Sequence, residues 1–188
     1  MRIDSEDSRA LVHAAAGLPA FALPYISQAV ALSLAALAIA FNALVLPRTS
    51  LGRHWAAKRP VSGVVLYPVA VLALLLLFWG QPLPVIVGWG VLAFGDSSAA
   101  VIGRRWPIRR LFYSQGKSLG GVYAFVVGAW LGIFLLLQQT GTVDLRTASE
   151  IALVAAVLGA LVESLPLPVN DNLTAPLAAA AFVVLLEY

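Results

Sequence analysis

The chain has 188 residues, of which 61% are hydrophobic and only 11% are charged, whereas soluble domains carry about 25% charged residues. This composition excludes a water-soluble domain and favours one membrane-embedded domain that covers residues 1–188. There is no cysteine, which excludes disulfides, thiolate metal sites and cysteine nucleophiles. We assign the net charge of +3 to loops that face anionic membrane lipids, and we expect no nucleic-acid partner.

Seven apolar stretches approach the roughly 20 residues that a helix needs to cross about 30 Å of hydrocarbon. They cover residues 10–25, 27–46, 61–79, 83–103, 118–138, 148–165 and 173–187. The pattern predicts an all-α, polytopic transmembrane bundle with about seven spans, of which the first and last are the shortest.

The basic residues lie almost entirely on one side of this topology. Two, four and five of the 12 Lys and Arg residues fall in the N-terminal segment, the loop at 47–60 and the loop at 104–117, and only Arg146 lies opposite. Because short cytoplasmic loops are enriched in Lys and Arg, we predict a cytoplasmic N-terminus.

Two carboxylates, Asp96 and Glu163, lie inside apolar spans, where a charged side chain costs at least about 2.5–3.5 kcal/mol. The topology brings both to the cytoplasmic half, together with Lys117 at the start of the fifth span and Asp171 in the loop 166–172. Ion pairs that only hold the bundle together, or a solvated Asp171, are the structural alternatives. The cost of burying Asp96 and Glu163 favours a functional site.

Small residues surround this predicted site. Gly95, Ala99 and Gly103 recur every four residues, which favours close helix packing and leaves room for a ligand beside Asp96. Similar spacing of Gly121, Ala124, Gly128 and Gly132 in the fifth span predicts packing alone.

The segment 116–121, Gly-Lys-Ser-Leu-Gly-Gly, opens the fifth span. A glycine-rich helix start with a lysine is a natural phosphate site. It is not a P-loop, because Leu111 stands where that motif needs its first glycine.

The loop after the sixth span is held by Pro166 and Pro168 and carries Asn170, Asp171 and Asn172. These three side chains are able to bind metal or ribose, although Asn172 is also a candidate cap for the last helix. Carboxylates beside a phosphate site indicate Mg²⁺ and a nucleotide.

Four stretches of the chain resemble the polyprenol kinase family, which includes phytol, farnesol and dolichol kinases and the CTP-dependent diacylglycerol kinase. They are Arg9 to His13, with Ala10 where the family has Lys; Gly63 to Pro68; Gly95-Asp96 through Gly103-Arg104 and on to Gly116–Gly121; and Glu163 through Asp171-Asn172 to Pro176. The short chain is most similar to bacterial and plastid phytol and farnesol kinases, since dolichol kinases are usually longer. The resemblance implies a multi-pass protein of a prokaryotic inner (cytoplasmic) membrane that phosphorylates a long-chain alcohol with CTP, or with ATP, at its cytoplasmic face.

The resemblance and the local chemistry together give a predicted site. Catalytic roles go to Asp96, Lys117, Glu163 and Asp171, and the three carboxylates among them are the predicted Mg²⁺ ligands. Nucleotide binding goes to Arg104, Gly116, Lys117, Ser118, Gly120, Gly121, Asn170 and Asn172, and substrate binding to His13 and Ser97.

Three other functions remain open at this stage: a CTP-dependent diacylglycerol kinase, a lipid-phosphate cytidylyltransferase, and a non-enzymatic transporter. The transporter is disfavoured because the polar residues occupy one half of the membrane only. The sequence does not choose between a monomer and a homodimer.

Overall fold

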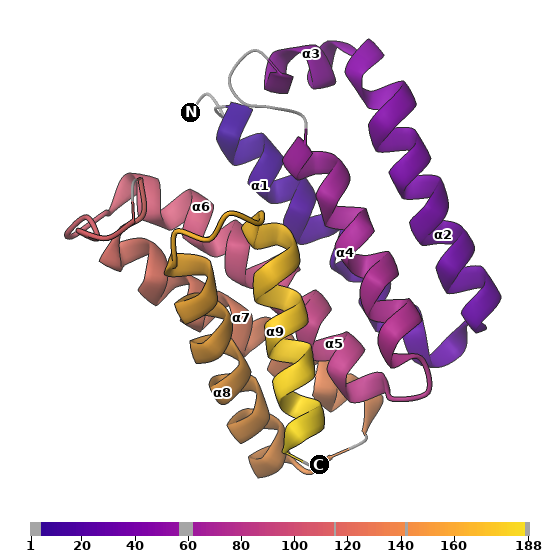
Figure 1. The fold of residues 1–188 in the computed structure, drawn as a ribbon. Coiled ribbons are helices and arrows are strands. Elements are labelled where there is room, and N and C mark those ends of the chain that lie inside the picture. The colour runs from indigo at the N-terminus through magenta and orange to yellow at the C-terminus, as the bar shows by residue number, and fades with distance from the viewer. Residues whose placement is uncertain (1–4, 57–61, 115, 142, 187–188) are drawn as a thin grey trace.

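The structure is a computed structural model that describes residues 5–56, 62–114, 116–141 and 143–186. These residues form a bundle of helices joined by mostly short connections (Figure 1), so the all-α prediction is confirmed. The α-helices are α1 (Ser5–Ala15), α2 (Gln28–Ala40), α3 (Ser50–Ala56), α4 (Ser62–Phe78), α5 (Pro82–Gly90), α6 (Asp96–Arg105), α7 (Leu119–Thr140), α8 (Leu145–Ser164) and α9 (Asp171–Leu185).

Within the described residues, four helices are long and apolar enough to cross a membrane. They are Gln28–Arg48, Pro82–Arg105, Leu119–Thr140 and Leu145–Ser164, whereas Gly63–Phe78 and Asp171–Leu185 are apolar but shorter. The first predicted stretch, residues 10–25, is not one α-helix, because α1 ends at Ala15 and a 3₁₀ helix, η1 (Leu18–Tyr25), follows. Pro19 and Pro24 lie in η1, and proline lacks the N–H that an α-helix uses.

Two of the long helices contain a π-helical turn. In the first, the turn is η2 (Phe41–Val45), followed by the 3₁₀ turn η3 (Leu46–Arg48), which contains Pro47. In the second, the turn is η4 (Val91–Gly95), which joins α5 to α6 and is followed directly by Asp96. Such turns occur frequently at functional sites, and here one of them sets the direction of α6 and the position of its first residue.

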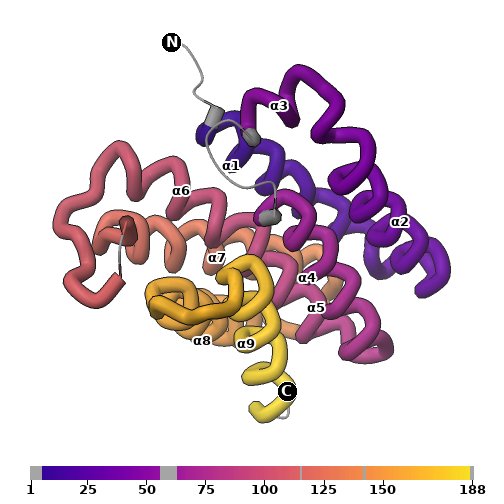
Figure 2. The backbone as a smooth tube through the Cα atoms, turned by 45° about the horizontal axis from the view of Figure 1, so that its top comes forward, coloured from indigo at the N-terminus to yellow at the C-terminus, as the bar shows by residue number. Residues whose placement is uncertain are grey.

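The helices run alternately between the two ends of the bundle (Figure 1). At the end that is uppermost in Figure 1, α4, α7 and α9 begin while α6 and α8 end. We call this the polar end. The view in Figure 2, from nearer this end, shows α8 and α9 side by side and α2 at the periphery against α4.

Close packing of α6 against α7 follows from small residues, as the sequence predicts. A Cβ on Gly103 would lie 2.8 Å from Gly121 Cα, and one on Gly128 would lie 2.1 Å from Ser98 Oγ. A Cβ on Gly132 would meet the ring of Phe94 at 2.1 Å. The two backbones therefore approach as closely as they do only because these positions lack side chains.

Two asparagines hold the start of α4. Pro68 in α4 cannot donate to the carbonyl four residues earlier, and that carbonyl, on Val64, accepts instead from Asn42 Nδ2 at 2.9 Å. One residue earlier, the Gly63 carbonyl accepts from Asn172 Nδ2 at 2.8 Å. The start of α4 is thus joined to α9 at the polar end, where the candidate site lies.

Candidate active site

A cavity of about 660 Å³ opens at the polar end. Its walls come from α1, α4, α6, α8, α9 and the segment that leads into α7. The four charged residues with predicted catalytic roles, Asp96, Lys117, Glu163 and Asp171, all line this one cavity. Segments far apart in the sequence therefore meet at one place, as the predicted topology requires.

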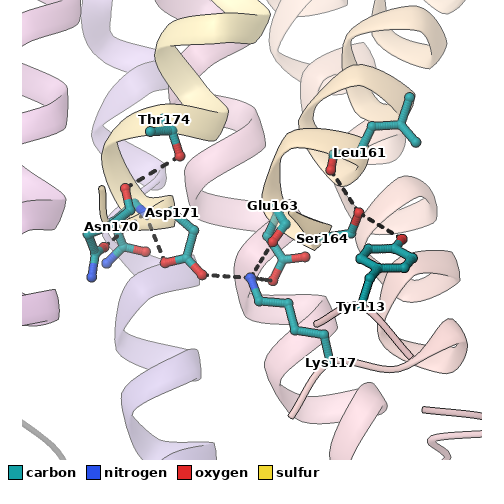
Figure 3. A network of polar contacts seen from close by, with 9 residues as sticks. Tyr113, Lys117, Leu161, Glu163, Ser164, Asn170, Asp171 and Thr174 are labelled. Carbon is teal, nitrogen blue, oxygen red and sulfur yellow. Dashed lines mark hydrogen bonds and ion pairs between the residues drawn. The ribbon is translucent and has the colours of Figure 1, made fainter. Parts of the chain in front are cut away.

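Lys117 lies between two carboxylates (Figure 3). Its Nζ donates to Glu163 Oε1 at 2.7 Å, to Asp171 Oδ2 at 2.7 Å and to the backbone carbonyl of Glu163. An ammonium group has three donors and no acceptor, so all three are occupied. The side chains are partly to largely buried, with exposed fractions of 24% for Lys117, 12% for Glu163 and 39% for Asp171.

Two effects act on the pKa of Lys117 in opposite directions. Burial of the ammonium group lowers the pKa, but attraction by Glu163 and Asp171 and their hydrogen bonds outweigh this, so the pKa lies above its usual value. Lys117 is therefore a fixed positive charge at neutral pH.

At the start of α7, more backbone N–H groups donate to acceptors within the protein than the phosphate-site prediction assumes. Ser118 caps the helix, because its Oγ accepts from the Gly121 N–H at 3.1 Å. The Leu119 and Gly120 N–H groups donate to the carbonyls of Arg109 and Pro107. A Cβ on Gly120 would lie 1.8 Å from the Trp106 carbonyl oxygen, so this glycine allows Trp106 and Pro107 to pack onto the start of α7.

The start of α9 corrects one part of the sequence interpretation. Asn170, not Asn172, caps this helix, since Asn170 Oδ1 accepts from the Asn172 N–H at 3.0 Å. Asp171 is accordingly the first residue of the helix and not a loop residue. Asn170 and Asn172 both line the cavity, but the Asn172 side chain is buried and already bonded to Gly63.

His13 and Ser97, the predicted substrate-binding residues, are buried and are not among the residues that line the cavity. His13 packs against the ring of Tyr67, with 4.9 Å between ring centroids, and its backbone carbonyl accepts from Tyr67 Oη at 3.1 Å. His13 Nδ1 lies 3.7 Å from Asp96 Oδ2, and its Nε2 has no hydrogen-bond partner. The structure therefore places His13 behind Asp96, where it supports the cavity wall.

A second charged group, which the sequence does not reveal, joins α1 to α6. Arg104 and Arg105 contact the two oxygens of Asp7 at 2.7 Å each, and Arg104 also lies 3.5 Å from Glu6. The hydrogen bond from Arg104, with a smaller contribution from Arg105, lowers the pKa of Asp7. These partners lie 97 and 98 residues apart, so sequence spacing gives no sign of the pairing.

The cavity is rich in charge of both signs. Its lining includes four acidic and four basic side chains: Glu6, Asp96, Glu163, Asp171, Arg9, Arg104, Arg110 and Lys117. Of these, Glu6, Arg9 and Arg110 were not predicted as site residues. Among the described residues, no group of three or more His, Asp or Glu side chains is already arranged around a common metal position.

Fold and cavity together define a multi-pass membrane protein with a charged cavity at one end of its helical bundle. The chain is 35% identical to a probable phytol kinase 1 of Glycine max over 62% of its own length and 41% of that protein. It is 28% identical to a farnesol kinase of Arabidopsis thaliana (70% and 45% of the two chains) and 31% identical to a phytol kinase of Synechocystis (70% and 54%). By name these relatives are phytol and farnesol kinases, and the chain is similar to them over 62–70% of its own length.

The chain spans about half the length of the curated relatives it matches. No family model and no solved structure matches it.

Proposed function

We propose that this protein is a kinase that transfers the γ-phosphoryl group of CTP to the hydroxyl of a membrane-embedded isoprenoid alcohol. Phytol, farnesol and geranylgeraniol are the substrates to test first, because the matched relatives carry the names phytol kinase and farnesol kinase. The observation that carries the proposal is the position of Lys117 between Glu163 and Asp171 in a cavity that also contains Asp96 and several arginines.

Phosphoryl transfer depends mainly on positioning and on neutralising phosphate charge. In the proposed reaction, the alcohol oxygen bonds to the γ-phosphorus while the bond from that phosphorus to the β–γ bridging oxygen breaks. CDP leaves, and the hydroxyl proton passes to one of the carboxylates that now hold Lys117. Arg104, Arg110 and Lys117 would neutralise the triphosphate, since all three line the cavity.

Lys117 has no free donor for a phosphate in the present geometry. Nucleotide binding must therefore exchange at least one of its three acceptors, Glu163 Oε1, Asp171 Oδ2 or the Glu163 carbonyl, for a phosphate oxygen. Exchange of Glu163 Oε1 or Asp171 Oδ2 would leave that carboxylate oxygen free at the same moment as the phosphates arrive.

The residues fit Mg²⁺ in their donor chemistry. Carboxylate oxygens are the protein ligands that Mg²⁺ prefers, usually one or two together with water and phosphate oxygens. A cationic ammonium group already occupies the position between Glu163 and Asp171, and Asp96 lines the same cavity. Asp96, Glu163 and Asp171 would hold the ion, which supplies positive charge to the triphosphate when bound.

We also propose that the polar end faces the cytoplasm, on the basis of the uneven distribution of Lys and Arg. Because the chain has no cysteine, single-cysteine variants report orientation directly. In spheroplasts, an impermeant maleimide should label Arg146→Cys, at the opposite end, and should label Thr49→Cys, beside α3, only after lysis. The reverse pattern would invert the topology.

The activity test uses purified protein in detergent or nanodiscs with Mg²⁺, labelled CTP or ATP, and a panel of phytol, farnesol, geranylgeraniol and diacylglycerol. We expect a prenyl monophosphate and CDP, and a loss of at least about 100-fold in kcat/KM for Asp96→Asn and Lys117→Ala. Release of pyrophosphate would identify a cytidylyltransferase. Wild-type turnover in both variants would show that the site is assigned wrongly.

A further inference from the structure

A second cavity of about 650 Å³ lies next to the first. Three residues line both cavities: Lys117, Asn170 and Asp171. A kinase must bring its two substrates within about 3–3.5 Å of each other at the reacting atoms. The shared wall, which carries one predicted catalytic lysine and one carboxylate, is where two substrates in two cavities would meet.

The two cavities differ in their linings. The first contains four basic and four acidic side chains, a combination that suits a triphosphate bound together with a divalent cation. Among the described residues that line the second, only Lys117 and Asp171 are charged. Most of the remainder is the apolar, proline-held run 165–169 together with Val162 and Tyr113. The second lining thus has fewer charged and more large apolar side chains than the first, with polar backbone and side-chain atoms between them, which favours a molecule that has an apolar body and a polar end.

Beside the second cavity, α8 carries a row of exposed apolar side chains. Leu153, Val157, Leu161 and Leu165 follow one another every four residues and are exposed by 48%, 40%, 55% and 48%. The first three lie on one face of α8, and Leu165, the residue that follows the helix, lines the second cavity. An isoprenoid chain could therefore lie along this face within the acyl chains while its hydroxyl end enters the cavity.

We infer that the second cavity is the binding site of the isoprenoid alcohol, with the first cavity left for the nucleotide. This inference rests on the proposed function. Leu167 and Val169 contact the isoprene units next to the hydroxyl and set the preference among alcohols. Among the described residues, Asp171 is the one carboxylate that lines both cavities.

The first experiment fills the second cavity with an indole ring. Leu167 and Val169 are 44% and 52% exposed, so a variant with tryptophan at either position should fold. For Leu167→Trp and Val169→Trp we expect the KM for farnesol, at fixed detergent, to rise at least about 10-fold while the KM for CTP stays within about 2-fold. Leu77→Trp, at the far end of α4 and 66% exposed, is the matched control and should change neither value.

The possible outcomes separate this inference from the proposed function. A rise in the KM for CTP, alone or together with that for farnesol, or no change in either, would overturn the assignment of the cavity while the kinase activity stands. A wild-type protein that phosphorylates no alcohol in the panel would refute the proposed function.

A second measurement does not depend on turnover. A farnesol analogue with a photoreactive diazirine near its hydroxyl should label residues 161–174. Unlabelled farnesol should abolish this labelling and CTP should not. Labelling that maps elsewhere, or that CTP abolishes, would overturn the inference even in a protein with no measurable activity.

Discussion

Replacement of Lys117 by methionine tests whether this residue occupies the place of a divalent cation. The substitution keeps an unbranched side chain of similar length but removes the charge between Glu163 and Asp171. Both carboxylate oxygens lie 2.7 Å from Lys117 Nζ, so they are separated by at most twice that distance, about 5.4 Å. Without the lysine, two negative charges face each other across this gap.

The size of the effect follows from that separation. Two unit charges about 5.4 Å apart repel each other by about 3 kcal/mol at an effective dielectric constant of about 20. A divalent cation that binds between them relieves this repulsion, and every 1.4 kcal/mol corresponds to a factor of ten in affinity. Lys117→Met should therefore bind Mn²⁺ about 100-fold more tightly than the wild type in the absence of nucleotide.

The assay is a Mn²⁺ titration of detergent-solubilised protein at pH 8, with free Mn²⁺ measured by electron paramagnetic resonance. Arg146→Met is the matched control, because Arg146 also pairs with a carboxylate at 2.7 Å, on Glu150, but at the exposed opposite end of the bundle. We expect the control to bind Mn²⁺ as the wild type does. Equal Mn²⁺ affinity in Lys117→Met and wild type would refute the reasoning that the ammonium group stands in for the metal.

Three further predictions concern the surroundings of the site. His13→Asn, whose amide nitrogen replaces the Nδ1 that faces Asp96, should retain most of kcat, whereas His13→Gln should lose about 10-fold; equal losses would indicate packing alone. Gly120→Ala should lower stability by about 1–3 kcal/mol or more, because its Cβ would lie 1.8 Å from the Trp106 carbonyl oxygen, while Gly63→Ala, with 3.7 Å to the nearest atom, should change the melting temperature little. Since folding raises the pKa of Lys117, its stabilising contribution is complete below the unfolded value of about 10.5 and disappears only as pH rises through the higher folded value. The melting temperature of the wild type should therefore show no pH-dependent step between pH 6 and 10 that is absent from Lys117→Met.

Much of the helical organisation could be predicted because hydrocarbon imposes a length and a composition on whatever crosses it. The convergence of Asp96 and Glu163 could be predicted for a related reason. A carboxylate inside an apolar span is costly, so both had to face a common polar space, and the alternating direction of the spans fixes the end at which that space lies. These arguments need only depth and direction, which a sequence contains.

Side-chain pairing could not be predicted in the same way. The contact of Arg104 and Arg105 with Asp7 depends on the rotation of α1 about its own axis, and a helix of 11 residues with charge near its start leaves that rotation open. The cap of α9 is Asn170 and not Asn172, because a shift of two residues in the helix start costs little where two asparagines lie two positions apart.

The same limit explains why the sequence predicts more free hydrogen-bond donors in the site than the structure has. A glycine-rich helix start and a lysine indicate phosphate binding by residue type, but in the structure the N–H groups of Leu119, Gly120 and Gly121 and all three donors of Lys117 have acceptors within the protein. These particular donors can therefore bind a phosphate only by exchanging the acceptors that they now have.

That exchange couples the binding of the nucleotide to the binding of the divalent ion in the proposed reaction. When Lys117 moves to a phosphate, Glu163 and Asp171 lose their cation, and a divalent ion then regains the interaction that the lysine gave up. By linkage, nucleotide and ion must raise one another's affinity by the same factor. In Lys117→Met the carboxylates are uncovered from the start, so nucleotide binding should strengthen Mn²⁺ binding less than in the wild type. Undiminished coupling in this variant would mean that the two ligands communicate through direct contact of metal and phosphate alone.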